Sequence, residues 1–148
     1  MKKIIFFLFS IFNFQFSIAQ SWQNVGNVGF SLGAASYTCI AIDRQGIPFV
    51  TYKDSSDDKN VVMKFNGTSW DSVGNIDSFA VQAGSFIDPI AIDSNGMPYV
   101  AYFDNTNSFK ANVIKFNGTS WQQVGSPNFS AGGANNISIS LNGSGVPY

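Results

Sequence analysis

The chain repeats itself at an interval of about 50 residues, and this repeat limits its possible folds more than any other feature. Residues 40–50 (IAIDRQGIPFV) return at 90–100 (IAIDSNGMPYV) and, more loosely, at 139–148 (ISLNGSGVPY). Residues 64–70 (KFNGTSW) return at 115–121, and the pattern Trp-x-x-Val-Gly begins at Trp22, Trp70 and Trp121. A unit this short cannot bury its own apolar surface, so neighbouring copies are expected to stack on one another.

Each repeat reads as four short β-strands. In the first repeat we expect strands near 37–43, 49–53, 60–65 and 69–73, where residues such as Ile40 and Ile42 alternate with smaller ones. The turn between the first two strands has the form Asp-x-x-Gly-x-Pro, with Asp43 and Gly46 in one copy and Asp93 and Gly96 in the next. The turn between the last two is Asn-Gly, a strong hairpin signal, at Asn66 and Gly67 and again at Asn117 and Gly118.

The predicted fold class is therefore all-β, with β-propeller blades of four antiparallel strands in an incomplete ring. The units cover about 36–74 and 87–125, a third begins over 135–148, and a lone closing strand is expected at 22–26. A β-sandwich or another stacked β-array is the alternative. Because a closed ring needs at least four blades, we expect either a fragment of a longer chain, which we favour, or several chains completing one ring.

Residues 1–19 have the pattern of a signal peptide. Lys2 and Lys3 precede an apolar run over residues 4–12, and a small-x-small site at residues 17–19 predicts cleavage before Gln20. The apolar run is too short to favour a membrane anchor, and no transmembrane span is expected in the mature chain, 20–148. The protein is therefore predicted to be exported by a bacterial cell and either secreted or held on the outer cell surface.

Composition removes several classes of function. The chain has no His and no Glu, and beyond residue 19 it has six basic and nine acidic residues, a net charge of −3. This balance gives no reason to expect nucleic acid as a partner. The single Cys39 cannot form a disulfide within the chain and is read as a small apolar residue. No catalytic or cofactor motif is present, so no cofactor is predicted.

The pieces Phe-Asn-Gly-Thr-Ser-Trp, Trp-x-x-Val-Gly and Asp-x-x-Gly-x-Pro-[Phe/Tyr]-Val resemble kelch-like and related propeller repeats of secreted proteins of the Bacteroidetes type. The resemblance covers nearly all of residues 22–148. The chain departs from the kelch pattern because paired glycines occur once, at Gly132 and Gly133. The resemblance implies a propeller fold. Proteins of this kind often carry a carboxy-terminal sorting domain, which in this protein would lie beyond Tyr148.

Length differences between the repeats point to one face of the predicted propeller as the ligand face. The first-to-second and third-to-fourth strand turns have constant length, whereas the second-to-third loop and the loop between units vary. All the variable loops belong to one face, and binding residues concentrate in variable loops on a rigid scaffold. The candidates on this face are Asp57, Asp58, Phe86, Asp88, Asn105 and Asn107.

Other recurring polar and aromatic residues are read mainly as structural. Asp54, Asp57 and Asp58 form an oxygen-rich loop that is a weak candidate for calcium, with a solvated hairpin as the favoured reading. Asp43 and Asp93 recur at one turn position and are read as turn caps. The three tryptophans are read as packing between blades, with sugar stacking as the alternative.

The predicted function is a non-catalytic binding or adhesion module that presents a propeller face to an extracellular carbohydrate or protein. The first alternative is an enzyme acting on polysaccharide, of glycoside hydrolase or lyase type, which would need two positioned carboxylates. Asp77 and Asp88 are the acids that stand apart from the repeat. The second alternative is a purely structural repeat array.

Overall fold

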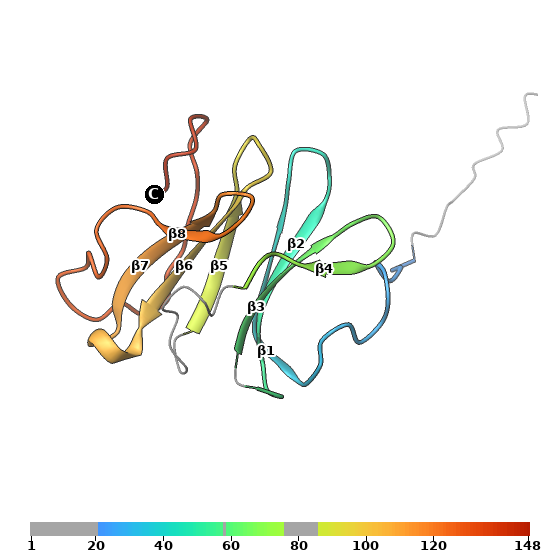
Figure 1. Cartoon of the computed structure of the whole chain (residues 1–148), viewed down its shortest axis with the longest axis horizontal. Helices are drawn as coiled ribbons and strands as arrows, with labels where there is room; N and C mark the ends of the chain where they lie inside the picture. The colour runs from blue at the N-terminus through green and yellow to red at the C-terminus, as the bar shows by residue number, and fades with distance from the viewer. Residues whose placement is uncertain (1–20, 58, 76–85) are drawn as a thin grey trace, which may run out of the picture.

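The computed structural model describes residues 21–57, 59–75 and 86–148, with the side chains of 86–88 outside the description. The predicted signal peptide, Asp58 and Asp77 lie outside the described residues. The structure consists of two four-stranded antiparallel sheets (Figure 1). The first, in the order of its strands, contains β1 (Ala35–Ile42), β2 (Pro48–Asp54), β3 (Lys59–Phe65) and β4 (Trp70–Ser72). The second contains β5 (Phe86–Ile92), β6 (Pro98–Asp104), β7 (Lys110–Phe116) and β8 (Trp121–Gln123).

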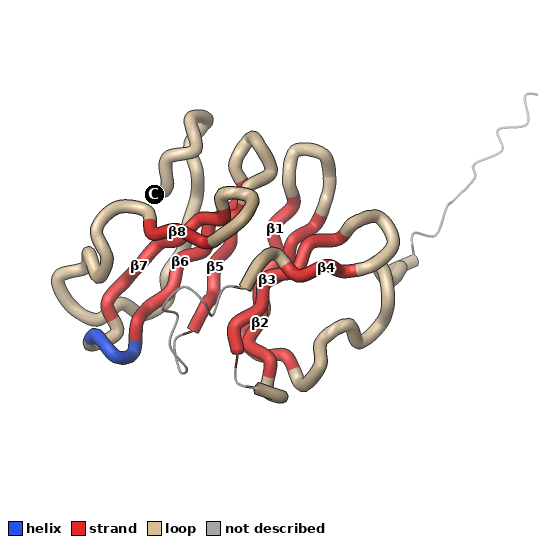
Figure 2. Tube along the Cα trace, viewed as in Figure 1, coloured by secondary structure: helices blue, strands red, loops and turns tan. Residues whose placement is uncertain are grey.

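These two sheets, here called the first and second blade, confirm the predicted fold class: all-β, with sheets arranged like propeller blades in an open ring. The observed strands lie within about two residues of the expected ones, since alternation and turn residues fix strand ends locally. A 3-10 turn, η2 (Asn105–Asn107), follows β6 (Figure 2). Among the described residues, no helix is long and apolar enough to cross a membrane.

The core lies between the blades. We call the side of a blade that faces the preceding repeat its front face and the opposite side its rear face. Phe49 and Val62 on the rear face of the first blade pack with Ile90, Val100 and Ile114 on the front face of the second. All five are at most 7 % exposed, so the stacking predicted from the repeat provides the burial that a single sheet lacks.

The turns between the first two strands of each unit are built identically. The Asp43 carboxylate accepts hydrogen bonds from the backbone N–H groups of Gln45 (2.9 Å) and Ile47 (2.8 Å). Asp93 binds its own turn in the same way, and so does Asn142 in the third repeat. An amide oxygen therefore serves as well as a carboxylate here, which fits a turn-capping role for this position.

Two of the three tryptophans, Trp70 and Trp121, link successive repeats as expected, whereas Trp22 is fully exposed and packs against no blade in the described structure. Trp121 Nε1 donates to the backbone carbonyl of Val73 at 2.9 Å, and Trp70 Nε1 donates to that of Val25 at 2.9 Å. The acceptor is in both cases the valine of the preceding Trp-x-x-Val-Gly pattern. We call this contact the Trp–Val link. In the pattern at residues 70–74, Trp70 is the donor of one link and Val73 is the acceptor of the other, which explains why Trp and Val recur together.

Two further segments of the repeat pattern lie before the first blade and after the second. Residues 21–25 form no strand, so the expected closing strand over 22–26 is absent from the structure, and Trp22 is fully exposed. A strand exists only where a partner strand accepts its hydrogen bonds, and none lies beside this segment in the described part of the chain. At the other end, Ser140 and Tyr148 exchange backbone hydrogen bonds, and Leu141 pairs with Pro147. This hairpin begins the third repeat.

Candidate ligand-binding face

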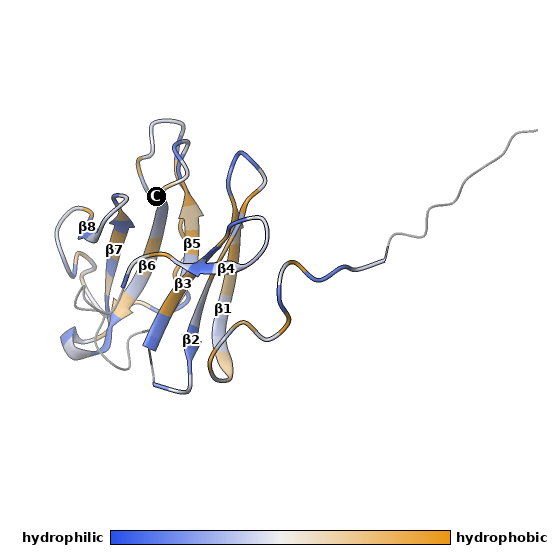
Figure 3. Ribbon diagram, turned by 45° about the vertical axis from the view of Figure 1, so that its right-hand side comes forward, coloured by the Kyte–Doolittle hydropathy of each residue, from blue (hydrophilic) through white to orange (hydrophobic). Residues whose placement is uncertain are grey.

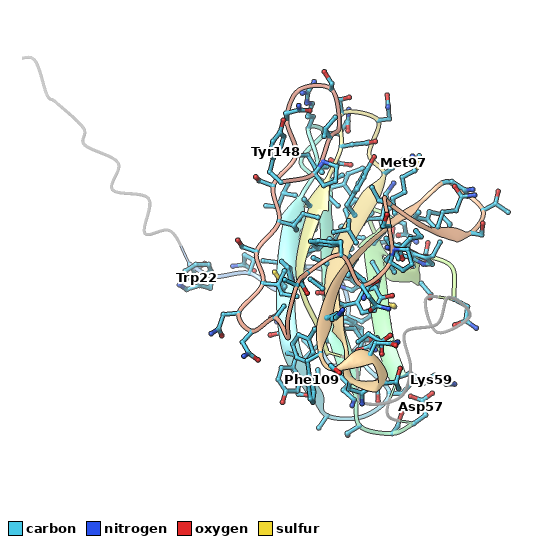
Figure 4. The ribbon with its side chains drawn as sticks, turned by 90° about the vertical axis from the view of Figure 1, so that its left-hand side faces the viewer. Trp22, Asp57, Lys59, Met97, Phe109 and Tyr148 are labelled. Atoms are coloured by element: carbon cyan, nitrogen blue, oxygen red, sulfur yellow. The ribbon has the colours of Figure 1, made fainter. Side chains whose placement is uncertain are left out.

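The loops between the second and third strands of both blades lie at one end of the molecule. Figure 4 shows Asp57, Lys59 and Phe109 at this end, with Met97 and Tyr148 at the opposite end. The start of β1 belongs to the same end because Ala35 pairs with Asp54. We call this end the loop face. It is the face that the variable loop lengths indicated.

Asp54 organises the loop face of the first blade. Its carboxylate accepts hydrogen bonds from the Ser56 N–H (2.9 Å) and hydroxyl (2.7 Å), and from the N–H groups of Leu32 (3.0 Å) and Gly33 (3.2 Å). The bonds from Ser56, followed by those from Gly33 and Leu32, hold the pKa of Asp54 below its ordinary value, although burial acts in the other direction. Asp54 is thus a buried, ionised anchor for two loops.

Asp104 has the equivalent place in the second blade. Burial acts to raise its pKa, but hydrogen bonds from Thr106 and Asn107 outweigh burial, and the pKa lies below its ordinary value. Asn107 donates its side-chain N–H to this carboxylate, so this candidate residue shapes its own loop. Asn105 is half-buried in η2.

The weak calcium candidates do not form a cluster. The Asp54 oxygens accept the loop hydrogen bonds given above, and the Asp57 carboxylate pairs with Lys59 Nζ at 2.9 Å. Asp58 lies outside the described residues. Within the described ranges, no group of three His, Cys, Asp or Glu side chains could hold a metal ion.

Phe86 and Asp88 lie in β5, where Phe86 pairs with Phe103 near the loop face. Their side chains are outside the description, so these two residues stay predictions. The burial of Tyr102, and then the nearby Asp104 carboxylate, raise the pKa of this tyrosine to about 12. Burial, followed by Asp54 and Asp57, likewise raises the pKa of Tyr52.

Two exposed aromatic residues on the loop face have an unusual backbone conformation. Tyr37, at the irregularity in β1 between Ser36 and Cys39, has φ 52° and is 50 % exposed. Phe109 has φ 59° directly after Ser108 at φ 56°, and it is 48 % exposed. A bulky residue at positive φ is strained, and such strain concentrates at functional sites.

The sequence did not identify Tyr37, Lys59 or Phe109 as site residues. A partial signal existed for Phe109, because the second blade has one more residue between Asp104 and Lys115 than the first has between Asp54 and Lys64. Tyr37 gave no signal, since an aromatic residue at the start of a strand is ordinarily read as part of the core.

A cavity of about 380 Å³ opens beside the first blade and reaches the loop face. Phe30 and Tyr52 line its apolar part, and Asp57 and Lys59 line its polar part. Phe30 is held there by stacking on Trp70, with the ring centroids 4.8 Å apart. The size and the mixed lining are those of a small-ligand cavity.

No protein-family model matches the chain, and no curated protein matches its sequence. The structure is similar to that of a fucose lectin from Kordia zhangzhouensis in complex with methyl-fucoside, with a TM-score of 0.48 and 13% sequence identity. The match covers 74% of this chain and 78% of that chain. Similarity of this extent assigns no ligand to the present chain.

Proposed function

We propose that this chain is an exported, non-catalytic binding module whose loop face contacts an extracellular carbohydrate. The kelch-like pattern of the repeat and the predicted signal peptide support a secreted propeller of this kind. The observation that carries the proposal is the pair of exposed rings, Tyr37 and Phe109, which have a strained backbone. Phe109 lies at the loop face (Figure 4), and Tyr37 lies near the start of β1, where Ala35 pairs with Asp54. Backbone strain concentrates at functional sites. The Phe109 ring packs on Phe103, with the centroids 5.9 Å apart, and its exposed part is open to a ligand.

The chemistry of the loop face suits a sugar. An aromatic ring offers an apolar platform for the C–H face of a pyranose, at low cost in conformational entropy. The carboxylate of Asp57 and the ammonium group of Lys59, at the same end of the molecule as Phe109, can accept from and donate to hydroxyl groups. A protein surface could use the same rings, and it is the alternative ligand.

The described acids on this face do not support glycoside hydrolysis. A general acid needs a raised pKa so that it is protonated at neutral pH. The pKa values of Asp54 and Asp104 are instead lowered, and their oxygens already hold the loops. The Asp57 carboxylate is already engaged in an ion pair with Lys59 Nζ at 2.9 Å.

A glycan array followed by titration calorimetry tests the proposal. We expect the mature chain to bind a glycan, and Phe109→Ala or Tyr37→Ala to weaken that binding about fivefold, since loss of a stacking ring costs about 1 kcal/mol. Arg44→Ala is the matched control, because it removes a large exposed side chain from the turn at the opposite end. The control is expected to bind within about twofold of the unmodified chain.

Two results would contradict the proposal. One is a mature, folded chain that binds no glycan. The other is a bound glycan whose affinity is unchanged by both ring substitutions while circular dichroism shows the variants folded. Release of sugar products from a bound polysaccharide would instead support the enzymatic alternative.

A further inference from the structure

Phe109 and the residue before it have a backbone conformation that other parts of the chain must impose. Phe109 lies at the loop face, where hydrophilic colour predominates over η2 and over the loop between β2 and β3 (Figure 3). Its φ is 59°, and the φ of Ser108 is 56°. Positive φ values in residues other than glycine are costly and persist only where the surrounding structure holds them. The contacts that hold them come from a segment that follows β8.

This supporting segment, residues 128–134, lies beside the beginning of β7 (Figure 1). The Ala134 N–H donates to the Phe109 carbonyl at 2.7 Å. The Ala111 N–H donates to the Ser130 hydroxyl at 3.0 Å. The supporting segment therefore binds the chain at Phe109 itself and again two residues beyond it.

The supporting segment is in turn fixed to the second blade. Asn112 of β7 is 2 % exposed, and its side-chain Nδ2 donates to Asn128 Oδ1 at 2.9 Å. The Asn128 N–H donates back to Asn112 Oδ1 at 2.8 Å. Within the segment, the Ser130 hydroxyl donates to the Gly132 carbonyl at 2.6 Å. Because its anchor is buried in the blade, the segment provides a fixed support for the loop beside it.

Gly133 packs directly on the strained residues. A Cβ added to Gly133 would lie 3.0 Å from the Ser108 carbonyl oxygen and 3.6 Å from the Phe109 Cβ. The first distance is shorter than a Cβ ordinarily tolerates, and the oxygen belongs to the backbone, so the loop would have to move. A Cβ added to Gly132 would meet no heavy atom of the described chain within 4 Å. Neither glycine has a positive φ, so the two differ in the space around them.

We propose that Gly133 is a positioning residue for Phe109. Its lack of a side chain lets the supporting segment come close enough to hold Ser108 and Phe109 in their strained conformation, and so to present the ring at the loop face. The inference rests on the proposed function for the role of the ring, whereas the positioning is a property of the chain without ligand. The paired glycines noted in the sequence thus have different roles, since Gly132 has room for a side chain.

Amide hydrogen exchange of the mature chain, resolved by residue with NMR, tests the positioning without any ligand. We expect Gly133→Ala to speed exchange of the Ala134 N–H about tenfold or more, because its bond to the Phe109 carbonyl is loosened. Gly132→Ala is the matched control and should change this rate by less than about twofold. The amide of the buried Val100 should exchange at an unchanged rate in both variants.

Two exchange results overturn the positioning role. One is an Ala134 rate that is the same in both glycine variants. The other is an equal increase at Ala134 and Val100 in Gly133→Ala, which indicates a general loss of stability.

Binding to the glycan array, quantified by calorimetry with the glycan that the array retains most strongly, tests the consequence for the ring. We expect Gly133→Ala to weaken binding severalfold, up to the loss caused by Phe109→Ala, and Gly132→Ala to leave it unchanged. If Gly133 acts through the ring, the double variant Phe109→Ala with Gly133→Ala binds as Phe109→Ala alone does. Additive losses overturn the inference.

The two measurements distinguish failure of the inference from failure of the proposed function. Binding that is weakened by Phe109→Ala and unchanged by Gly133→Ala overturns the inference and leaves the function standing. An array that retains none of the proteins contradicts the function, and the exchange rate of Ala134 then still decides whether Gly133 positions Phe109.

Discussion

Aspartate serves as a structural anion at both ends of the blades. At one end Asp43 and Asp93 cap tight turns. At the other, Asp54 ties two loops that are separate in sequence, and Asp104 holds its own loop. In each case the carboxylate accepts backbone N–H groups that would otherwise have no acceptor. The nine aspartates of a chain without glutamate are thus partly explained, because a short carboxylate reaches a nearby backbone and a longer one does not.

Asp54→Ala is expected to lower the free energy of unfolding by about 2 kcal/mol, because the N–H groups of Leu32, Gly33 and Ser56 lose the buried carboxylate that they share as acceptor. Urea denaturation followed by circular dichroism measures the change. Asp57→Ala removes an exposed ion pair and should change stability by less than about 0.5 kcal/mol. Equal effects of the two substitutions would contradict the assigned role of Asp54.

At the scale of elements, the turns and the loops of each blade differ in how far the sequence determines them. The strands and both kinds of turn were predictable because alternation, Asp-x-x-Gly and Asn-Gly act over a few residues. The exposed positions of Tyr37 and Phe109 were not, because a positive φ in a bulky residue is imposed by surrounding structure and has no local signature. The prediction of a closing strand over 22–26 was wrong for a related reason. A strand needs a partner strand, and the sequence of the segment itself does not show whether one is present.

The strain at Phe109 can be separated from the contribution of its ring. Phe109→Gly and Phe109→Ala both remove the ring, but glycine adopts φ 59° without steric cost. We expect the glycine variant to be more stable than the alanine variant by about 0.5–1 kcal/mol, with equally weak glycan binding. Thermal unfolding and calorimetry measure the two effects. Lower stability of the glycine variant would show that the backbone at this residue is not strained.

At the scale of the whole molecule, the titrating groups predict a wide pH range of constant stability. Asp54 and Asp104 have lowered pKa values in the folded chain, so their stabilisation is complete above the ordinary aspartate pKa and is lost as the pH falls through the folded values. The chain has no histidine, so no histidine titration falls between pH 5 and 8. Tyr102, whose pKa is raised, affects stability at alkaline pH.

We expect the melting temperature to be constant from about pH 5 to pH 9 and to fall below about pH 4. It should also fall from about pH 10 upward, because the pKa of Tyr102 is raised to about 12 in the fold, and the fold therefore opposes an ionisation that the unfolded chain permits. Tyr102→Phe should reduce the alkaline loss and leave the acid loss unchanged. A histidine-like step near pH 6.5 would contradict this assignment.

The Trp–Val link joins residues 48 positions apart in one case and 45 in the other, and the first blade supplies the donor of one link, Trp70, and the acceptor of the other, Val73. A blade taken alone would keep neither bond. On heating, such a chain should therefore unfold from its outermost repeats inward. The stability of any blade then depends on how many neighbours it has as well as on its own sequence.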